Sequence, residues 1–223
     1  MSAVVITGAG SGLGRELAFA FAKKGYTVIL LGRTQKNLDE VKEQIVNNNG
    51  TAASFVLDIT KKENVENVFK EIANTYPISI VVNNAGIGHF GPFENMTDQE
   101  VKEIIDVNVM GTIHVSKAAL PYLKKRKAGN LIQIISTAGL RGKKHEAVYS
   151  ASKFAVRGLT ESLQKEYKDT SISVTAVYMG GMKTPFWDNN NHIQDKSRLA
   201  PPEKIATIIL ERFQNEEEII IES

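Results

Sequence analysis

Two residues in the second half of the chain, Tyr149 and Lys153, combine types and a spacing that suit proton transfer. They lie four positions apart in a segment of helical periodicity, so their side chains would share one face of a helix. A phenol ordinarily has a pKa of about 10, and a neighbouring ammonium group lowers that pKa by stabilising the phenolate. The pair therefore suits a general acid or base that acts on a carbonyl or alcohol. None of the other tyrosines has a lysine four residues later.

Two kinds of segment alternate around this pair. Short, nearly continuous apolar runs predict strands that are covered on both faces, as in a parallel sheet. Amphipathic segments of helical length separate them, and Thr97–Glu100 matches a capping box at the start of one. The expected strands are Ala3–Thr7, Thr27–Leu31, Ala52–Leu57, Ile78–Asn83, Leu131–Ser136, Ile172–Tyr178 and Glu218–Glu222. The expected helices are Leu13–Lys24, Lys36–Asn47, Lys61–Thr75, Asp98–Lys124, Ala147–Lys168 and Pro202–Phe213.

This alternation predicts the fold class and the place where a ligand binds. Strands that alternate with helices form a doubly wound α/β sheet, here of about seven parallel strands with helices on both faces. The chain contains no linker-like or low-complexity run, so we expect a single domain over residues 1–223. Such sheets bind ligands beyond the carboxyl ends of their strands, so the turns after the strands should carry the function.

The first of these turns is rich in glycine. Gly8, Gly10, Gly12 and Gly14 occupy the junction between the first strand and the first helix. Glycines there let the backbone approach a pyrophosphate, whose charge the helix N-terminus stabilises. Glycines at such a junction can also be purely structural, and this motif alone leaves both interpretations open.

The second turn bears on which dinucleotide would bind. An acid at the end of the second strand would bind the ribose hydroxyls and repel a 2′-phosphate. Gly32 holds that place here, and Arg33 and Thr34 follow it. A guanidinium beside an uncharged position favours NADP(H), with NAD(H) as the alternative. Two other interpretations stay open, since Arg33 could be a plain surface charge and an acid in the next helix could take over the ribose contact.

Taken together, the motifs resemble those of the short-chain dehydrogenase/reductase family. They comprise the spacing of Thr7 and the glycines, the sequence Asn83–Gly86, Ser136, the Tyr149–Lys153 pair and Thr184, and they occur in family order over essentially the whole chain. The resemblance implies a Rossmann-type fold, with a cofactor half over about residues 1–130 and a catalytic and substrate half over about 131–223. It also implies hydride transfer between NADP(H) and a small carbonyl or alcohol substrate.

The resemblance assigns roles residue by residue. Tyr149 would be the general acid or base, Lys153 would tune it and hold the nicotinamide ribose, and Ser136 would hydrogen-bond the substrate carbonyl. Asn108 would position a water that relays protons to Lys153. The residues expected to bind the cofactor are Gly8, Ser11, Gly12, Leu13, Gly14, Arg33, Asp58, Asn84, Ala85, Gly86, Tyr149, Lys153 and Thr184, with Asp58 against the adenine ring.

The loops after the fourth, fifth and sixth strands should form the substrate pocket. We expect apolar walls from Phe90, Phe93, Met182, Phe186 and Trp187, and contacts with an anionic group from His89, Lys143, Lys144, His145 and Arg198. Met179 stands where the family usually has proline, which should loosen the turn after the sixth strand. The long, Asn-rich loop over residues 179–198 should be mobile and should order over the substrate.

Composition excludes several classes of function. The chain has 27 basic and 25 acidic residues, which is too small an excess for a nucleic-acid partner. It has no cysteine, and its four histidines are scattered, so we expect no metal site. No apolar run approaches the roughly 20 residues of a membrane helix, and the sequence starts directly with a strand, so we expect a cytoplasmic protein.

Three functions fit these observations. The first is an NADP(H)-dependent carbonyl reductase or alcohol dehydrogenase. The second is a non-redox enzyme on the same scaffold, such as an epimerase or a dehydratase, and the third is a non-catalytic sensor of the nucleotide. The expected helices Asp98–Lys124 and Ala147–Lys168 are long and apolar, so we also expect a homodimer or homotetramer.

Overall fold

The computed structural model describes residues 2–188, 192–193 and 195–221. Its sheet has seven strands in the order β3-β2-β1-β4-β5-β6-β7, and every neighbouring pair is parallel. The strands are β1 Ala3–Thr7, β2 Thr27–Gly32, β3 Thr51–Val56, β4 Ile78–Asn83, β5 Gly129–Ile134, β6 Ile172–Met179 and β7 Glu218–Ile221. The predicted doubly wound α/β fold is therefore confirmed.

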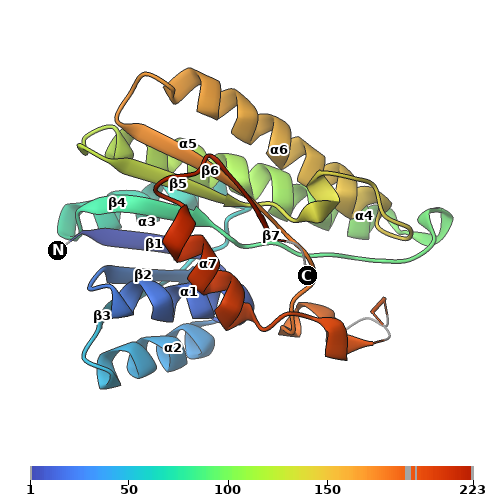
Figure 1. The fold of residues 1–223 in the computed structure, drawn as a ribbon, viewed down its shortest axis with the longest axis horizontal. Helices are drawn as coiled ribbons and strands as arrows, with labels where there is room; N and C mark the ends of the chain where they lie inside the picture. The colour runs from blue at the N-terminus through green and yellow to red at the C-terminus, as the bar shows by residue number, and fades with distance from the viewer. Residues whose placement is uncertain (1, 189–191, 194, 222–223) are drawn as a thin grey trace.

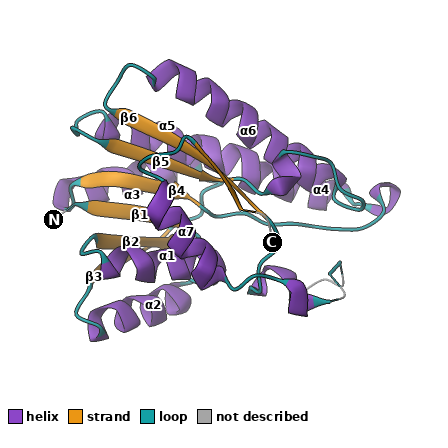
Figure 2. Ribbon diagram, viewed as in Figure 1, coloured by secondary structure: helices purple, strands orange, loops and turns teal. Residues whose placement is uncertain are grey.

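Helices cover both faces of this sheet (Figures 1 and 2). In β1, Val4 and Ile6 pack into one core with α1, α2 and α7, whereas Ala3 and Val5 pack into a second core with α3 and α5. This alternation explains why the strand is apolar throughout. The main helices are α1 Gly12–Lys23, α2 Gln35–Asn47, α3 Lys62–Thr75, α4 Asp98–Ile104, α5 Thr112–Leu123, α6 Ala147–Tyr167 and α7 Pro202–Arg212. Figure 1 shows α7 beside α1, although the two lie at opposite ends of the sequence.

The strand order reverses at β1, which pairs with β2 on one side and with β4 on the other. Chain connections leave the sheet in opposite directions at such a point, and a crevice opens beyond the carboxyl ends of the two central strands. The turns after β1 and β4 therefore form the floor of any ligand site.

Most predicted helix and strand bounds lie within one residue of the observed ones. The fifth strand is an exception, because β5 ends at Ile134 and Ser136 lies two residues beyond it, with a φ of 109°. The sixth strand extends through Met179, which pairs with Ile221. Met179 therefore belongs to the sheet, where a proline could not donate a ladder hydrogen bond. Glu222, expected in the last strand, lies outside the described residues.

The expected long helix Asp98–Lys124 is interrupted. Its first part, α4, starts with the predicted capping box, in which Thr97 and Glu100 each bond the other's backbone N–H. Residues Ile105–Gly111 then form a π-helical segment before α5 begins. Such widened turns cluster at functional sites, and this one carries Asn108.

Candidate active site

The turn between β1 and α1 is shaped by close backbone contacts. Gly8 has a φ of 65°, and a Cβ at this position would lie 3.0 Å from the Cα of Ala85. A Cβ at Gly14 would lie 2.3 Å from the carbonyl oxygen of Gly8, which no real side chain tolerates. The glycines thus let α1 begin directly against the turn, so that its N-terminal N–H groups face the crevice.

The hydroxyl of Thr7 joins this turn to the one after β4. Its Oγ1 accepts hydrogen bonds from the backbone N–H groups of Asn84 (3.0 Å) and Ala85 (3.1 Å) and donates to the carbonyl of Val82 (3.3 Å). The side-chain amide of Asn84 donates hydrogen bonds to the carbonyls of Thr7 (3.0 Å) and Gly8 (3.3 Å). These bonds fix the two turns as one unit.

A cleft of about 960 Å³ runs from this unit to helix α6. It passes the carboxyl ends of β2 and β3 on one side and the segment after β6 on the other. The predicted cofactor and catalytic residues that line it are Gly8, Ser11, Gly12, Leu13, Arg33, Asp58, Asn84, Ala85, Gly86, Ser136, Tyr149, Lys153 and Thr184. Gly14 and Asn108 lie one layer behind the cleft wall.

One end of the cleft carries a cation beside a carboxylate. Arg33 is exposed there, as Thr34 and Asn37 are. Burial opposes ionisation of Asp58, but hydrogen bonds from the hydroxyl and the N–H of Thr60 and the charge of Arg33 outweigh it and hold the pKa of Asp58 below its ordinary value. Neither Thr34 nor Asn37 was predicted to bind the cofactor, because short polar residues are common at any helix start.

The alternative of an acid in α2 finds no support at this end. Asp39 is hydrogen-bonded to Gln35 (2.7 Å) and to Ser54 (3.1 Å), and it does not line the cleft. The Asp39 carboxylate therefore links α2 to β3 by hydrogen bonds.

The other end of the cleft brings Ser136, Tyr149 and Lys153 together. The three are at most 8% exposed. The Ser136 and Tyr149 hydroxyls are hydrogen-bonded to each other. The Nζ of Lys153 lies 5.7 Å from the centre of the Tyr149 ring and donates to the carbonyl of Ile134 at 3.3 Å. The positive φ of Ser136 turns the chain after β5, and Oγ also accepts from the N–H of Ala138 (3.2 Å).

Burial dominates the titration of this pair. It raises the pKa of Tyr149, and although the bond with Ser136 lowers that pKa, the charge of Glu146 adds to the rise. Burial lowers the pKa of Lys153 to about 8. The predicted lowering of the Tyr149 pKa by an ammonium neighbour is therefore wrong for the chain alone, because desolvation of the phenolate is the larger effect.

Asn108 ties the wall of the cleft to α6. Its Oδ1 accepts from the N–H of Ile87 (2.9 Å), and its Nδ2 donates to the carbonyl of Ile87 (2.9 Å) and to the hydroxyl of Ser152 (3.0 Å). A Cβ at Gly86 would lie 3.3 Å from Oδ1 of Asn108 and 3.5 Å from Nζ of Lys153. The π-helical segment thus places Asn108 where it supports the turn that faces Lys153.

Aromatic side chains surround the exposed edge of Tyr149. The ring centre of Phe90 lies 5.4 Å from that of Tyr149, and the ring centre of Phe186 lies 6.0 Å from it. Phe90 stacks on Trp187 at 5.2 Å and on His192 at 4.7 Å. Met182 also lines the cleft, whereas Phe93 does not and is 65% exposed, so its predicted place in the wall is wrong.

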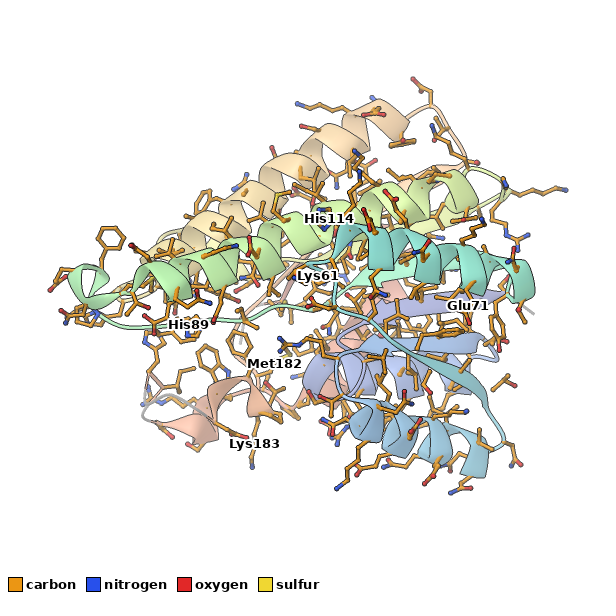
Figure 3. The ribbon with its side chains drawn as sticks, turned by 180° about the vertical axis from the view of Figure 1, so that it is seen from behind. Lys61, Glu71, His89, His114, Met182 and Lys183 are labelled. Carbon is orange, nitrogen blue, oxygen red and sulfur yellow. The ribbon has the colours of Figure 1, made fainter. Side chains whose placement is uncertain are left out.

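Only two of the five residues that were predicted to contact an anionic group line the cleft. His89 and Lys143 line the cleft, whereas Lys144, His145 and Arg198 do not. Figure 3 shows His89 on the segment after β4, facing the segment after β6 that carries Met182 and Lys183. Residues 189–191 and 194 of the Asn-rich loop, which we expected to order over the substrate, lie outside the described residues.

Sequence reasoning missed two residues at this end of the cleft, Glu146 and His192. Glu146 is buried just before α6, and its Oε1 lies 2.9 Å from Nε2 of His192. The position of Glu146 three residues before Tyr149 was a usable signal, because both would share a helix face. The partner lies 46 positions along the chain, a separation that no local pattern reveals.

Two kinds of feature are absent from the described ranges. In residues 2–188, 192–193 and 195–221, no three His, Cys, Asp or Glu side chains are grouped to hold a metal ion. In the same ranges, no helix is both long and apolar enough to cross a bilayer.

Comparison with known proteins gives consistent matches over most of the chain. A family model described as short chain dehydrogenase matches residues 2–195. An uncharacterized oxidoreductase of Staphylococcus epidermidis is 35% identical over 188 residues, which cover 84% of this chain and 80% of that protein. The 3-oxoacyl-[acyl-carrier-protein] reductase FabG of Thermotoga maritima is 31% identical, over 92% of this chain and 87% of the relative. Among solved structures, an alcohol dehydrogenase of the archaeon Thermococcus sibiricus, complexed with 5-hydroxy-NADP, has a TM-score of 0.90 at 26% identity and covers 100% of this chain and 96% of that one.

Proposed function

This chain belongs to the short-chain dehydrogenase/reductase family of oxidoreductases, and on that premise we propose that it transfers a hydride between NADP(H) and a carbonyl or alcohol substrate. The observation that carries the proposal is the buried set of Ser136, Tyr149 and Lys153 at one end of a cleft whose other end holds the glycine-rich turn and Arg33. A proton donor and an anion-binding turn at the two ends of one cleft are what dinucleotide-dependent carbonyl reduction requires.

The cleft fits a dinucleotide phosphate. The turn at Gly8 and the start of α1 would hold the pyrophosphate, and Arg33 would pair with a 2′-phosphate. Thr184, next to Gly12, would bind near the nicotinamide, and Lys153 would hold its ribose. The archaeal alcohol dehydrogenase, whose structure is complexed with 5-hydroxy-NADP, supports the same class of cofactor here.

Side chains of this protein would supply and replace the proton that the reaction needs. When bound, reduced nicotinamide supplies the hydride to the carbonyl carbon. Tyr149 gives its phenolic proton to the carbonyl oxygen, so one hydride and one proton convert the carbonyl to an alcohol. Ser136 holds that oxygen next to Tyr149, Lys153 stabilises the phenolate that remains, and Asn108 positions the turn beside Lys153 and a water for proton return.

Loss of NADPH absorbance with a panel of aldehydes, ketones, diketones and quinones tests this function. We expect turnover that prefers NADPH over NADH and a loss of roughly 10²- to 10⁴-fold in kcat/KM for Tyr149→Phe. Tyr167→Phe is the matched control, because Tyr167 is a buried tyrosine of the same helix outside the cleft. Binding of NADPH without turnover would favour a sensor, and product formation without net NADPH loss would favour an epimerase or dehydratase.

The assembly and the location of the protein stay predictions. A homodimer or homotetramer and a cytoplasmic location are the states that we expect for this enzyme.

A further inference from the structure

A buried carboxylate lies beside the proposed catalytic tyrosine. Glu146 precedes α6 directly, its side chain is 7% exposed, and it lines the cleft. Glu146 is also within electrostatic reach of Tyr149, because its charge adds to the rise in pKa that burial causes there.

Part of the wall around Tyr149 is aromatic. Phe90 and Phe186 flank the phenol, and His192 stacks on Phe90 with an angle of 15° between the rings. The same imidazole lies 2.9 Å from Oε1 of Glu146. Glu146 and His192 therefore form one hydrogen-bonded unit beside these aromatic rings.

The other ionisable groups at this end already have polar partners. His89 faces two carboxylates, Glu103 at 3.0 Å and Glu100 at 3.8 Å. Lys143 donates to the hydroxyl of Thr137 at 3.0 Å. Both histidines near this end thus already contact carboxylates, and the buried charged side chains around the phenol are the carboxyl group of Glu146 and the amine of Lys153.

We propose that Glu146 makes this site select uncharged, apolar carbonyl substrates and reject those that carry a carboxylate beside the carbonyl group. The inference rests on the proposed function, because it concerns the substrate of that same site. A substrate carboxylate held next to Tyr149 would lie near a second, buried negative charge. For two unit charges about 10 Å apart at an effective dielectric constant of about 20, the repulsion corresponds to roughly a tenfold or larger loss of kcat/KM.

A matched pair of aromatic keto compounds tests the proposal. Methyl benzoylformate is neutral, and benzoylformate carries a carboxylate on the same skeleton. We expect the wild-type protein with NADPH to give a kcat/KM at least about tenfold higher for the ester. Glu146→Gln should lower the ester-to-acid ratio by about tenfold, whereas Glu146→Asp, which keeps the charge, should retain a high ratio.

Glu161→Gln is the control for loss of one carboxylate from the same helix. Glu161 pairs with Arg157 at 2.6 Å and does not line the cleft, so this variant should keep the wild-type ratio. If Glu146→Gln does not fold, Glu146→Met fills similar space without charge and is measured instead.

The outcomes separate the two proposals. Equal use of acid and ester by the wild-type protein, or an unchanged ratio in Glu146→Gln, would overturn the role of Glu146. Turnover of other carbonyl compounds without turnover of the ester would also overturn it and leave the reductase function intact. Failure of every carbonyl compound in the panel would instead overturn the proposed function.

Discussion

Replacing Thr7 by valine tests how the floor of the cleft is held together. Valine has nearly the same shape as threonine, so the substitution removes the hydroxyl without opening a large cavity. Thr7 is 1% exposed, and its Oγ1 is the acceptor for the N–H groups of both Asn84 and Ala85. The variant therefore leaves two backbone donors without their partner at the point where the turns after β1 and β4 meet.

The structure sets the size of the effect. A buried donor that loses its partner costs about 1–3 kcal/mol. Asn84 and Ala85 are only half-buried beside the cleft, where water can replace part of the lost bond. At the lower end for each donor, Thr7→Val should reduce the free energy of unfolding by about 2 kcal/mol. It should also weaken NADPH binding, because Asn84, Ala85 and Gly86 line the cleft.

Urea unfolding followed by circular dichroism measures the free energy, and fluorescence titration measures NADPH binding. Thr160→Val is the matched control, because Thr160 is fully buried and its hydroxyl donates only to the helix carbonyl of Val156 at 2.7 Å. That change leaves no backbone N–H without a partner and should lower the free energy of unfolding by less than about 1 kcal/mol. Equal stability loss in the two variants would refute the idea that Thr7 acts as the joint between the turns.

Three other changes test separate parts of the site. Arg33→Ala should lower kcat/KM with NADPH by roughly 10- to 100-fold and change that with NADH far less, because only NADPH offers a 2′-phosphate; parallel steady-state assays compare the two. Lys153→Met should abolish turnover yet stabilise the fold by about 3 kcal/mol at pH 7, because burial lowers the pKa of Lys153 from 10.5 to about 8. Between these values the unfolded chain holds a proton that the folded chain has released, so wild-type stability rises with pH, and urea unfolding at pH 7 and pH 10.5 should show the difference shrinking. Ile105, Met110 and Phe154 are 36%, 41% and 42% exposed on adjoining helical segments, so Phe154→Glu should turn a dimer or tetramer into monomer in light scattering.

The fold was predictable from local patterns, because the five inner strands of the sheet are buried on both faces and their apolar runs are nearly continuous. The π-helical turn at Ile105–Gly111 was not, since one widened turn barely disturbs the apolar periodicity of a long helix. The turn carries Asn108, which bonds to Ile87 and Ser152, 21 and 44 residues away in the sequence. Contacts of such long range become visible only when the tertiary structure brings the three residues together.

The site was predictable wherever a motif is local, as at the glycine turn and the Tyr149–Lys153 pair. It was not predictable where burial decides the chemistry. The spacing of Tyr149 and Lys153 indicated a cation beside a phenol, but the sequence does not show how little water reaches either group. The pairing of Glu146 with His192 likewise depends on the return of the segment after β6 to the start of α6.

The burial of Tyr149 and Lys153 has a consequence for the direction of catalysis. Desolvation favours the neutral form of each group, and the charge of Glu146 further disfavours the phenolate. Near neutral pH the chain therefore presents a protonated phenol, which is the form that donates to a carbonyl oxygen. Oxidation of an alcohol requires the phenolate and works against both effects. We therefore expect the rate of alcohol oxidation to rise with pH above neutrality while the rate of carbonyl reduction does not, and a rise of both rates in parallel would contradict this assignment of Tyr149.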